Sequence, residues 1–191
     1  MAKTESTFRN MVLSLTFISF AAAVCVGFVN EFTKKPIELS KINKKLKAIR
    51  QVVPDFNNNP DLEMYKLPTD EGDSLDIYPA KKDNQIVGYA VNTYTKKGFS
   101  GNINLMAGFT ADGTIFKITV IDHKETPGLG SKMNDPVFKD QFNGRNPSSF
   151  KLKVRKDGGQ VDAITAATIS PRAFCDAVDR AYNTIQKGGS K

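Results

Sequence analysis

The sequence predicts an α+β fold in which one N-terminal transmembrane helix precedes a single domain built from an antiparallel sheet and flanking helices. Three observations support this prediction. A run of uncharged residues lies near the N-terminus, three runs of strand length joined by turn signals follow in the middle of the chain, and an amphipathic segment lies at the C-terminus. Mixed strands and helices with hairpin connections are typical of the α+β class.

The uncharged run covers residues 11–29 and follows a short tail, residues 1–10. As a helix it would be about 28 Å long, which matches the hydrocarbon core of a bilayer, so we interpret it as a retained membrane anchor. A cleaved signal peptide is the alternative, but its apolar core is normally shorter, and no small-x-small cleavage site follows Val29 before the charged residues begin. A lipoprotein cysteine at Cys25 is disfavoured by the bulky Val24 before it and by its depth in the run.

Residues 30–76 are expected to form a basic stalk helix and a connection. Apolar residues at intervals of three or four, with lysines between them, predict an amphipathic helix over residues 36–53 that ends near Pro54. Such a helix can pack on its own domain or contact the membrane surface, and the two are compatible. Residues 54–76 are rich in Asn, Pro and acidic residues, which predicts an irregular connection.

The remaining domain, residues 77–191, is predicted to contain strands over residues 86–94, 103–109 and 115–121. Two of these runs alternate in polarity. The alternating residues are Ile103, Leu105, Ala107 and Phe109 on one strand, and Phe116, Ile118 and Val120 on the next. Ala111-Asp112-Gly113 supplies the turn between them, and Gly98-Phe99-Ser100-Gly101 joins the first two strands, most simply as a plain hairpin turn.

Further along the chain, Asn134 or Asp135 can cap a short helix over residues 136–142, and residues 151–154 can add a last strand. The terminal amphipathic helix is expected over residues 171–186, with Ser170 as its N-cap.

This placement puts the Thr168 hydroxyl beside a helix N-terminus, where free N–H groups and the helix dipole favour a phosphate. A phosphate esterified to Thr168 is therefore physically plausible. Taken without any family likeness, the same residues also fit a strand that leads into an ordinary capped helix.

The basic excess lies near the membrane anchor. The first 53 residues hold nine Lys or Arg and three Asp or Glu, whereas the rest of the chain holds 18 and 17. This distribution favours membrane lipid as a partner and argues against nucleic acid. Because seven Lys or Arg follow the anchor within residues 34–50 and only Lys3 and Arg9 precede it, the positive-inside rule alone predicts a cytoplasmic domain.

Two cysteines and one histidine provide few metal ligands. Cys25 lies in the anchor and Cys175 in the terminal helix, so a disulfide between them is implausible, and no Cys/His spacing indicates zinc or an iron–sulfur cluster. His123 is more simply a surface residue than a proton donor. We expect no metal and no catalytic acid or nucleophile, so any redox role requires an organic cofactor.

Two motifs carry a family resemblance. The segment Asp162-Ala163-Ile164-Thr165-Ala166-Ala167-Thr168 resembles the Asp-x-x-(Ser/Thr)-Gly-Ala-Thr signature of FMN-binding domains that are modified by a flavin transferase, with Ala166 where the usual residue is Gly. The segment Glu125-Thr126-Pro127-Gly128-Leu129-Gly130 resembles a loop that this family packs against the flavin ring. With the single anchor and the short chain, the whole sequence resembles the G subunits of Rnf electron-transport complexes.

The resemblance implies covalent FMN, held through a phosphoester to Thr168, with Asp162 opening the flavinylation signature. The implied cofactor-binding residues are Glu125, Thr126, Gly128, Leu129, Thr165, Ala166 and Ala167. If the turn of this signature needs a positive φ, the methyl group of Ala166 would strain it.

The implied function is electron transfer within an ion-translocating complex that couples ferredoxin and NAD, with the other membrane and peripheral subunits and the flavin transferase as partners. The resemblance further implies the bacterial inner membrane, with the domain on the periplasmic or outer side, opposite to the prediction from charge alone. Two alternatives remain: the C subunit of a sodium-translocating NADH:quinone reductase, and a non-redox scaffold or assembly protein with the same fold.

Overall fold

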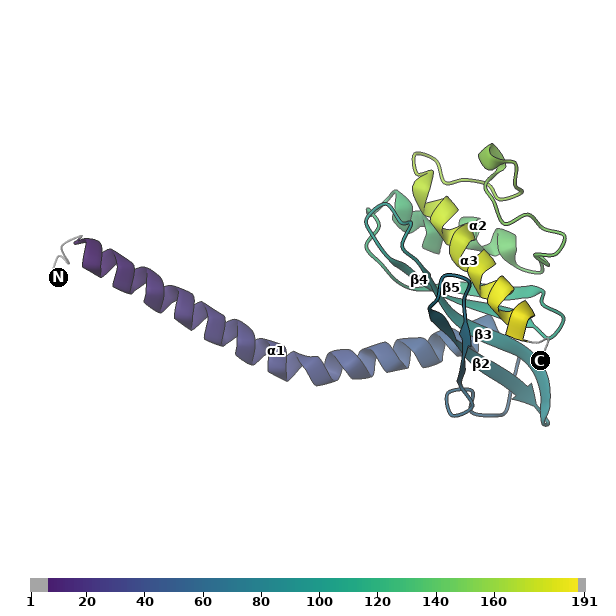
Figure 1. Cartoon of the computed structure of the whole chain (residues 1–191), viewed down its shortest axis with the longest axis horizontal. Helices are drawn as coiled ribbons and strands as arrows, with labels where there is room; N and C mark the ends of the chain where they lie inside the picture. The colour runs from purple at the N-terminus through teal and green to yellow at the C-terminus, as the bar shows by residue number, and fades with distance from the viewer. Residues whose placement is uncertain (1–6, 189–191) are drawn as a thin grey trace. The chain divides into compact units, whose positions relative to one another are not determined.

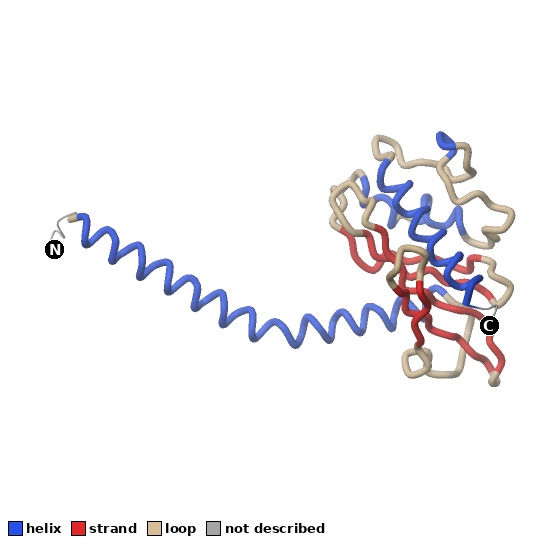
Figure 2. Tube along the Cα trace, viewed as in Figure 1, coloured by secondary structure: helices blue, strands red, loops and turns tan. Residues whose placement is uncertain are grey.

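The computed structural model describes residues 7–188. The chain divides between Asn43 and Lys44 into two compact units, whose described parts are residues 7–43 and 44–188. Most of the expected tail, residues 1–10, lies outside the described residues. Figure 1 shows the elements in chain order, and Figure 2 separates helices, strands and loops. The elements are α1 (Phe8–Val52), β1 (Tyr65–Pro68), β2 (Ser74–Lys82), β3 (Gln85–Thr95), β4 (Ile103–Thr110), β5 (Ile115–His123), α2 (Pro136–Lys139) and α3 (Ile169–Gly188), with short 3-10 helices at Gly130–Asn134, Asp140–Phe142 and Arg155–Asp157.

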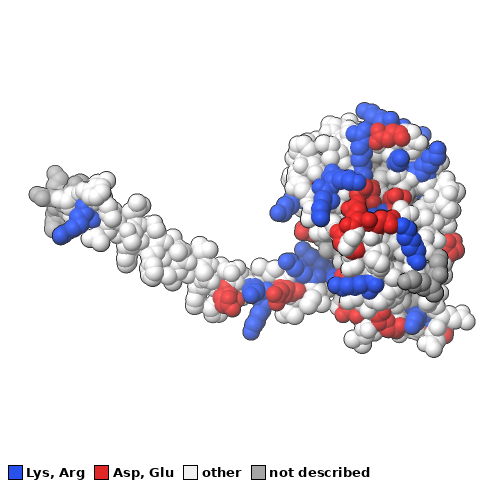
Figure 3. Space-filling view, in the orientation of Figure 1, with Lys and Arg blue, Asp and Glu red and all other residues white. Residues whose placement is uncertain are grey.

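Helix α1 joins the expected membrane segment and the expected stalk without interruption. It continues through Pro36, which was expected to begin a second helix, and ends at Val52, just before Pro54 as predicted. Its large apolar side chains from Phe8 to Phe32 are exposed, and this stretch is free of charge over most of its length in Figure 3. Among residues 7–188, only α1 is long and apolar enough to cross a membrane.

The five strands form one antiparallel sheet in the order β1-β2-β3-β4-β5, so each strand pairs with its neighbours in sequence. The three strands predicted from the sequence are confirmed as β3, β4 and β5. The irregular connection expected over residues 54–76 is wrong for its second half, because β1 and the start of β2 lie there. The expected domain boundary at residue 77 consequently falls inside β2.

The two faces of the sheet bury different helices (Figure 1). One face packs against α3, and the predicted alternation on β4 is confirmed because all four of its residues lie in this core. The other face packs against the last turns of α1, where Ala48, Ile49 and Val52 are buried. The sheet is therefore covered on both sides, and its strands carry apolar residues on both faces.

A bulge corrects the alternation predicted for β5. The register shifts between Gly108 and Phe109, so that Phe109 pairs with Ile115 and Gly108 pairs with Lys117. The extra residue, Phe116, is therefore only half-buried, and Ile115 is fully buried in its place.

Between the sheet and α3 the chain is mostly irregular. The short helix predicted over residues 136–142 is divided into α2 and a 3-10 turn, and Asp135 precedes it without a side-chain capping bond. The strand predicted over residues 151–154 is wrong, because only an isolated bridge between Val154 and Val161 forms there.

Cys175 lies on the buried side of α3 and should be chemically inert in the folded protein. Burial, with a smaller contribution from the charge of Asp179, raises the pKa of this thiol from 9.0 to about 12. Because only the thiolate is nucleophilic, we expect alkylation of Cys175 at pH 8 to be about a thousandfold slower in the native protein than in the unfolded chain. Mass spectrometry of a Cys25→Ser variant, with and without denaturant, measures this ratio. Rapid labelling without denaturant would contradict it.

Candidate functional site

The two motifs meet at a cavity of ≈ 260 Å³ beside the start of α3. Three segments far apart in sequence form its wall: the loop after β3, the loop after β5 and the residues that lead into α3. The lining residues are Phe99, Glu125, Thr126, Leu129, Gly130, Ala166, Ala167, Thr168, Ile169 and Ser170.

Six of the nine site residues expected from the sequence line this cavity, and three do not. Gly128 shapes the loop from outside the wall, while Thr165 and Asp162 are exposed beyond it. Four lining residues were not among those expected: Phe99, Gly130, Ile169 and Ser170.

Thr168 immediately precedes the first residue of α3 and is half-buried. Among the described residues, its hydroxyl has no hydrogen-bond partner, so it is available to a ligand. Because α3 is 20 residues long, the free N–H groups and partial positive charge of its N-terminus lie next to this oxygen. This position is favourable for a phosphate.

The loop after β5 contains the type II turn that Pro127-Gly128 predicts. The Leu129 N–H donates to the Thr126 carbonyl at 3.2 Å, and Gly128 has a φ of 75°. The Gly128 N–H also donates to the Ser131 hydroxyl at 2.9 Å. This geometry holds Leu129, with 42% of its surface exposed, at the rim of the cavity.

The Glu125 side chain connects the three segments that form the cavity wall. It is only 4% exposed, and its two oxygens accept hydrogen bonds from the Ser100 N–H at 3.0 Å and from the Ser170 hydroxyl at 2.6 Å. One backbone N–H and one side-chain hydroxyl thus hold this carboxylate in place.

Ser170 is not the N-cap of α3, as the sequence suggested. The helix begins at Ile169, two residues before the expected start at Pro171, and the Ser170 side chain is directed inward to Glu125. A partner 45 residues away along the chain therefore determines its role. The local capping pattern cannot reveal such a partner.

His123 supports the same loop from its other end. The Glu125 N–H donates to His123 Nδ1 at 3.1 Å, and His123 Nε2 lies 2.9 Å from the side-chain amide of Asn134. Both nitrogens are thus used in holding the loop, and the ring is not among the residues that line the cavity.

Asp162 is exposed and does not line the cavity. Its carboxylate pairs with Arg155 at 2.5 Å, with both side chains about two-thirds exposed, and its N–H donates to Gln141 Oε1 at 2.7 Å. These contacts fix the start of the motif rather than the cavity wall.

Ala166 occupies the left-handed region of backbone conformation that the sequence comparison with Gly anticipated. The Ala167 N–H donates to the Ile164 carbonyl at 3.1 Å, and Ala166, the third residue of this turn, has a φ of 62°. An L-residue with a Cβ pays about 1–2 kcal/mol for this conformation. The turn thus forms with alanine, but under strain.

Replacing Ala166 with Gly should therefore stabilise the folded protein. We expect a gain of about 0.5–1 kcal/mol in the free energy of unfolding, since relief of the strain exceeds the added chain entropy of glycine. Ala163→Gly is the matched control, because Ala163 is exposed in the same segment without a positive φ, and it should lose about 0.4–1 kcal/mol. Chemical unfolding measures both. Destabilisation by both variants would contradict the strain at Ala166.

The residues that sequence reasoning missed form an apolar rim and the close-packed floor of the cavity. Phe99 and Ile169 are 68% and 44% exposed and lie with Leu129 around the opening. A Cβ on Gly98 would lie 2.8 Å from Glu125 Oε1, and one on Gly130 would lie 2.5 Å from Glu125 Oε2. Gly98 precedes Phe99, and Gly130 ends the Glu125 motif. These two glycines were the available signal in the sequence, because both let the backbone approach the Glu125 side chain closely.

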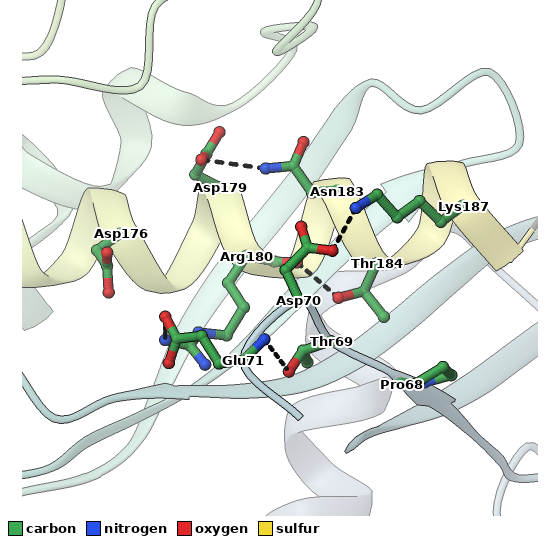
Figure 4. A pocket seen from close by; sticks show the side chains of 10 residues that line it. All are labelled: Pro68, Thr69, Asp70, Glu71, Asp176, Asp179, Arg180, Asn183, Thr184 and Lys187. Carbon is green, nitrogen blue, oxygen red and sulfur yellow. Dashed lines mark hydrogen bonds and ion pairs between the residues drawn. The ribbon is translucent and has the colours of Figure 1, made fainter. Parts of the chain in front are cut away.

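Other hollows on the domain lack the residues of both motifs. One of ≈ 770 Å³ lies beside β5, and one of ≈ 460 Å³ lies beside the first turns of α3. A third, of ≈ 130 Å³, lies between the β1–β2 turn and α3, where Glu71 pairs with Arg180 at 2.7 Å and Asp70 pairs with Lys187 (Figure 4). The Arg180 guanidinium also stacks over the Tyr94 ring at 5.2 Å, so these charges hold the hairpin to the helix.

Taken together, the cavity combines an exposed apolar rim, an unpartnered hydroxyl at a helix N-terminus and one buried carboxylate. This combination fits a flat aromatic ligand that carries a phosphate. Among residues 7–188, no group of three or more metal-ligating side chains is found.

The chain is similar to several known proteins. Residues 98–183 match the model of the FMN-binding domain. The chain is 34% identical to the G subunit of the ion-translocating oxidoreductase complex of Shewanella amazonensis, over 92% of this chain and 86% of that protein. It is 32% identical to the G subunit of the Na(+)-translocating ferredoxin:NAD(+) oxidoreductase complex of Acetobacterium woodii, over 91% and 89%. Among solved structures, NqrC of Shewanella oneidensis is similar at 20% identity and a TM-score of 0.46, over 61% of this chain and 63% of that one.

Proposed function

The chain belongs to the family of G subunits of ion-translocating oxidoreductase complexes, and on this premise we propose that it is a membrane-anchored electron-transfer subunit carrying FMN bound covalently to Thr168. The single observation that carries the proposal is the meeting of both family motifs at one cavity, with the Thr168 hydroxyl in its wall. Membership of this family supports FMN as the cofactor, and the cavity is where we expect it to bind.

The chain's own residues would hold and shield the cofactor rather than react with a substrate. The N-terminus of α3 offers N–H groups and a partial positive charge to the phosphate. Leu129, Phe99 and Ile169 offer apolar contact to a ring, and Gly128 fixes the loop that presents Leu129. Bound FMN would supply the ability to accept and release electrons, while the protein sets its position and potential.

Covalent attachment has a physical rationale for an electron carrier. A phosphoester holds the cofactor at the end remote from the ring, so the ring electronics are left to the residues around it. A covalent bond also prevents loss of the cofactor if the domain lies outside the cytoplasm. The flavin transferase and the other subunits of the complex are then the required partners.

The exposed apolar stretch of α1 supports membrane anchoring by a single helix. We further propose that the folded domain lies on the outer side of the bacterial inner membrane, where the flavin transferase of this family acts. The excess of basic residues after the anchor favours the opposite orientation, but long domains are translocated largely regardless of charge.

The family membership favours the G subunit of an Rnf-type complex over the quinone-reductase alternative. The scaffold alternative is made conceivable by Ala166, which replaces the usual Gly of the flavinylation signature. That reason is weakened because the turn forms with Ala166 at a φ of 62°.

The test is to produce the full-length protein with and without its flavin transferase and to separate it on a denaturing gel. Flavin fluorescence that survives denaturation, and appears only with the transferase, is the expected result. Mass spectrometry of the peptide containing Thr168 should show the FMN adduct. Protein that stays dark with an active transferase, verified on a second substrate protein, would refute the proposal.

A further inference from the structure

Glu125 is a buried negative charge in the cavity wall, and its hydrogen bonds come from neutral groups. Both carboxylate oxygens accept hydrogen bonds, one from the Ser100 N–H and one from the Ser170 hydroxyl. The side chain is 4% exposed. Within residues 7–188, no Lys, Arg or His forms an ion pair with it, so its charge is not neutralised locally.

The position of this charge is fixed by the backbone around it. Gly98 and Gly130 approach the carboxylate so closely that a Cβ on either would lie within 2.8 Å of one of its oxygens. Ser170 holds the second oxygen from the first turn of α3, two residues after Thr168. The carboxylate therefore cannot swing into solvent without separating the segments that form the cavity.

We propose that the Glu125 carboxylate lowers the one-electron reduction potential of the flavin held in this cavity. This inference rests on the proposed function, since it requires FMN at Thr168. The physical reason is that adding an electron next to a fixed, unneutralised negative charge is opposed by Coulomb repulsion, which a buried environment screens weakly. Glu125 is thereby a tuning residue, in addition to holding the loops together.

The expected size follows from the dimensions of the cavity. A ring in a space of ≈ 260 Å³ has part of its structure within about 10 Å of a charge in the wall. At that separation, and at the effective dielectric constant of about 20 typical of proteins, the repulsion exceeds a tenfold change in the ratio of oxidised to reduced flavin. For a one-electron couple a tenfold change corresponds to about 59 mV.

Glu125→Gln separates the charge from the hydrogen bonds. The glutamine carbonyl can accept from the Ser100 N–H, and its NH₂ group can donate to the Ser170 hydroxyl, which rotates to accept. Redox titration of the full-length, FMN-loaded protein in detergent, followed by flavin absorbance, measures the one-electron potential. In this variant the potential should be higher by at least about 59 mV, which corresponds to a tenfold change in the ratio of oxidised to reduced flavin. Thermal unfolding checks that the fold is retained.

Asp122→Asn is the matched control, because it removes the same charge from an exposed position three residues earlier. Solvent and salt screen that charge, so the flavin potential of the Asp122→Asn variant should stay near that of the unmodified protein. A Gln variant whose potential shifts no more than the control overturns the proposal. So does a Gln variant that takes up no FMN, because the proposal gives the charge no part in loading. Absence of FMN from the unmodified protein would instead refute the proposed function.

Discussion

Thr168→Val should abolish covalent flavin completely, so that the full-length protein made with its flavin transferase is dark on a denaturing gel. Valine keeps the shape of the side chain but has no oxygen to form the phosphoester. The fold should persist, because the Thr168 side chain is half-buried and its hydroxyl has no partner among the described residues. At most, loss of a polar residue before α3 should cost about 1 kcal/mol.

Two further variants make this result specific. Thr168→Ser keeps a hydroxyl at the same backbone position and should retain detectable fluorescence. Thr119→Val makes the same chemical change on β5, away from the cavity, and should leave the fluorescence unaltered. Fluorescence that persists in Thr168→Val would place the attachment on another side chain, and peptide mapping would identify it.

The sequence was informative where a pattern is local. Strands β3, β4 and β5 follow from alternating or continuous apolar runs, and the Pro127-Gly128 turn follows from the residues that a type II turn requires. The left-handed conformation of Ala166 was foreseeable because a related motif has Gly there. In each of these cases, neighbouring residues determine the structure.

Strands β1 and β2 were missed because long-range contacts stabilise them. β1 has only four residues, and β2 contains Pro79, which normally argues against a paired strand. Pro79 is tolerated because β1 pairs with β2 only as far as Ile77 and does not extend alongside Pro79. The Asn58 side chain takes the place of a partner strand there. The Asn58 side chain donates to the Pro79 carbonyl and accepts from the Lys81 N–H, each at 2.9 Å.

The site was predictable as two motifs but not as one cavity. Spacing could not show that Asp162 and Gly128 lie outside the wall, or that Ser170 is directed toward Glu125 instead of capping its helix. Phe99 was likewise expected to belong to a plain turn. Its place at the rim depends on the contact between Ser100 and Glu125, which are 25 residues apart.

Gly108→Ala should unfold or severely destabilise the domain, with a loss of at least about 3 kcal/mol in the free energy of unfolding. Gly108 lies in the middle of the sheet, on β4, paired to Ala90 on β3 and Lys117 on β5. The end of α1 rests directly on it. A Cβ at this position would lie 2.8 Å from the Val52 Cβ and nearer still to the Val52 carbonyl carbon and oxygen.

The clash cannot be relieved by repacking side chains, because its closest partner is backbone. Val52 is fully buried, so moving it away would open the second core, in which Ile49, Tyr78 and Met106 are also buried. Trimming the side chain with Val52→Ala leaves both its Cβ and its carbonyl oxygen in place. The double variant should therefore show no rescue and should be at least as unstable as Gly108→Ala alone.

Gly72→Ala distinguishes this steric effect from the general cost of replacing glycine. Gly72 has a φ of 90°, but a Cβ there would meet no atom within 4 Å, so only backbone strain of about 1–2 kcal/mol is expected. Chemical unfolding of the full-length variants in detergent compares the two. Equal losses at both positions would mean that the end of α1 does not rest on β4 as described, because the contact at Gly108 would then add nothing to the strain of an ordinary turn.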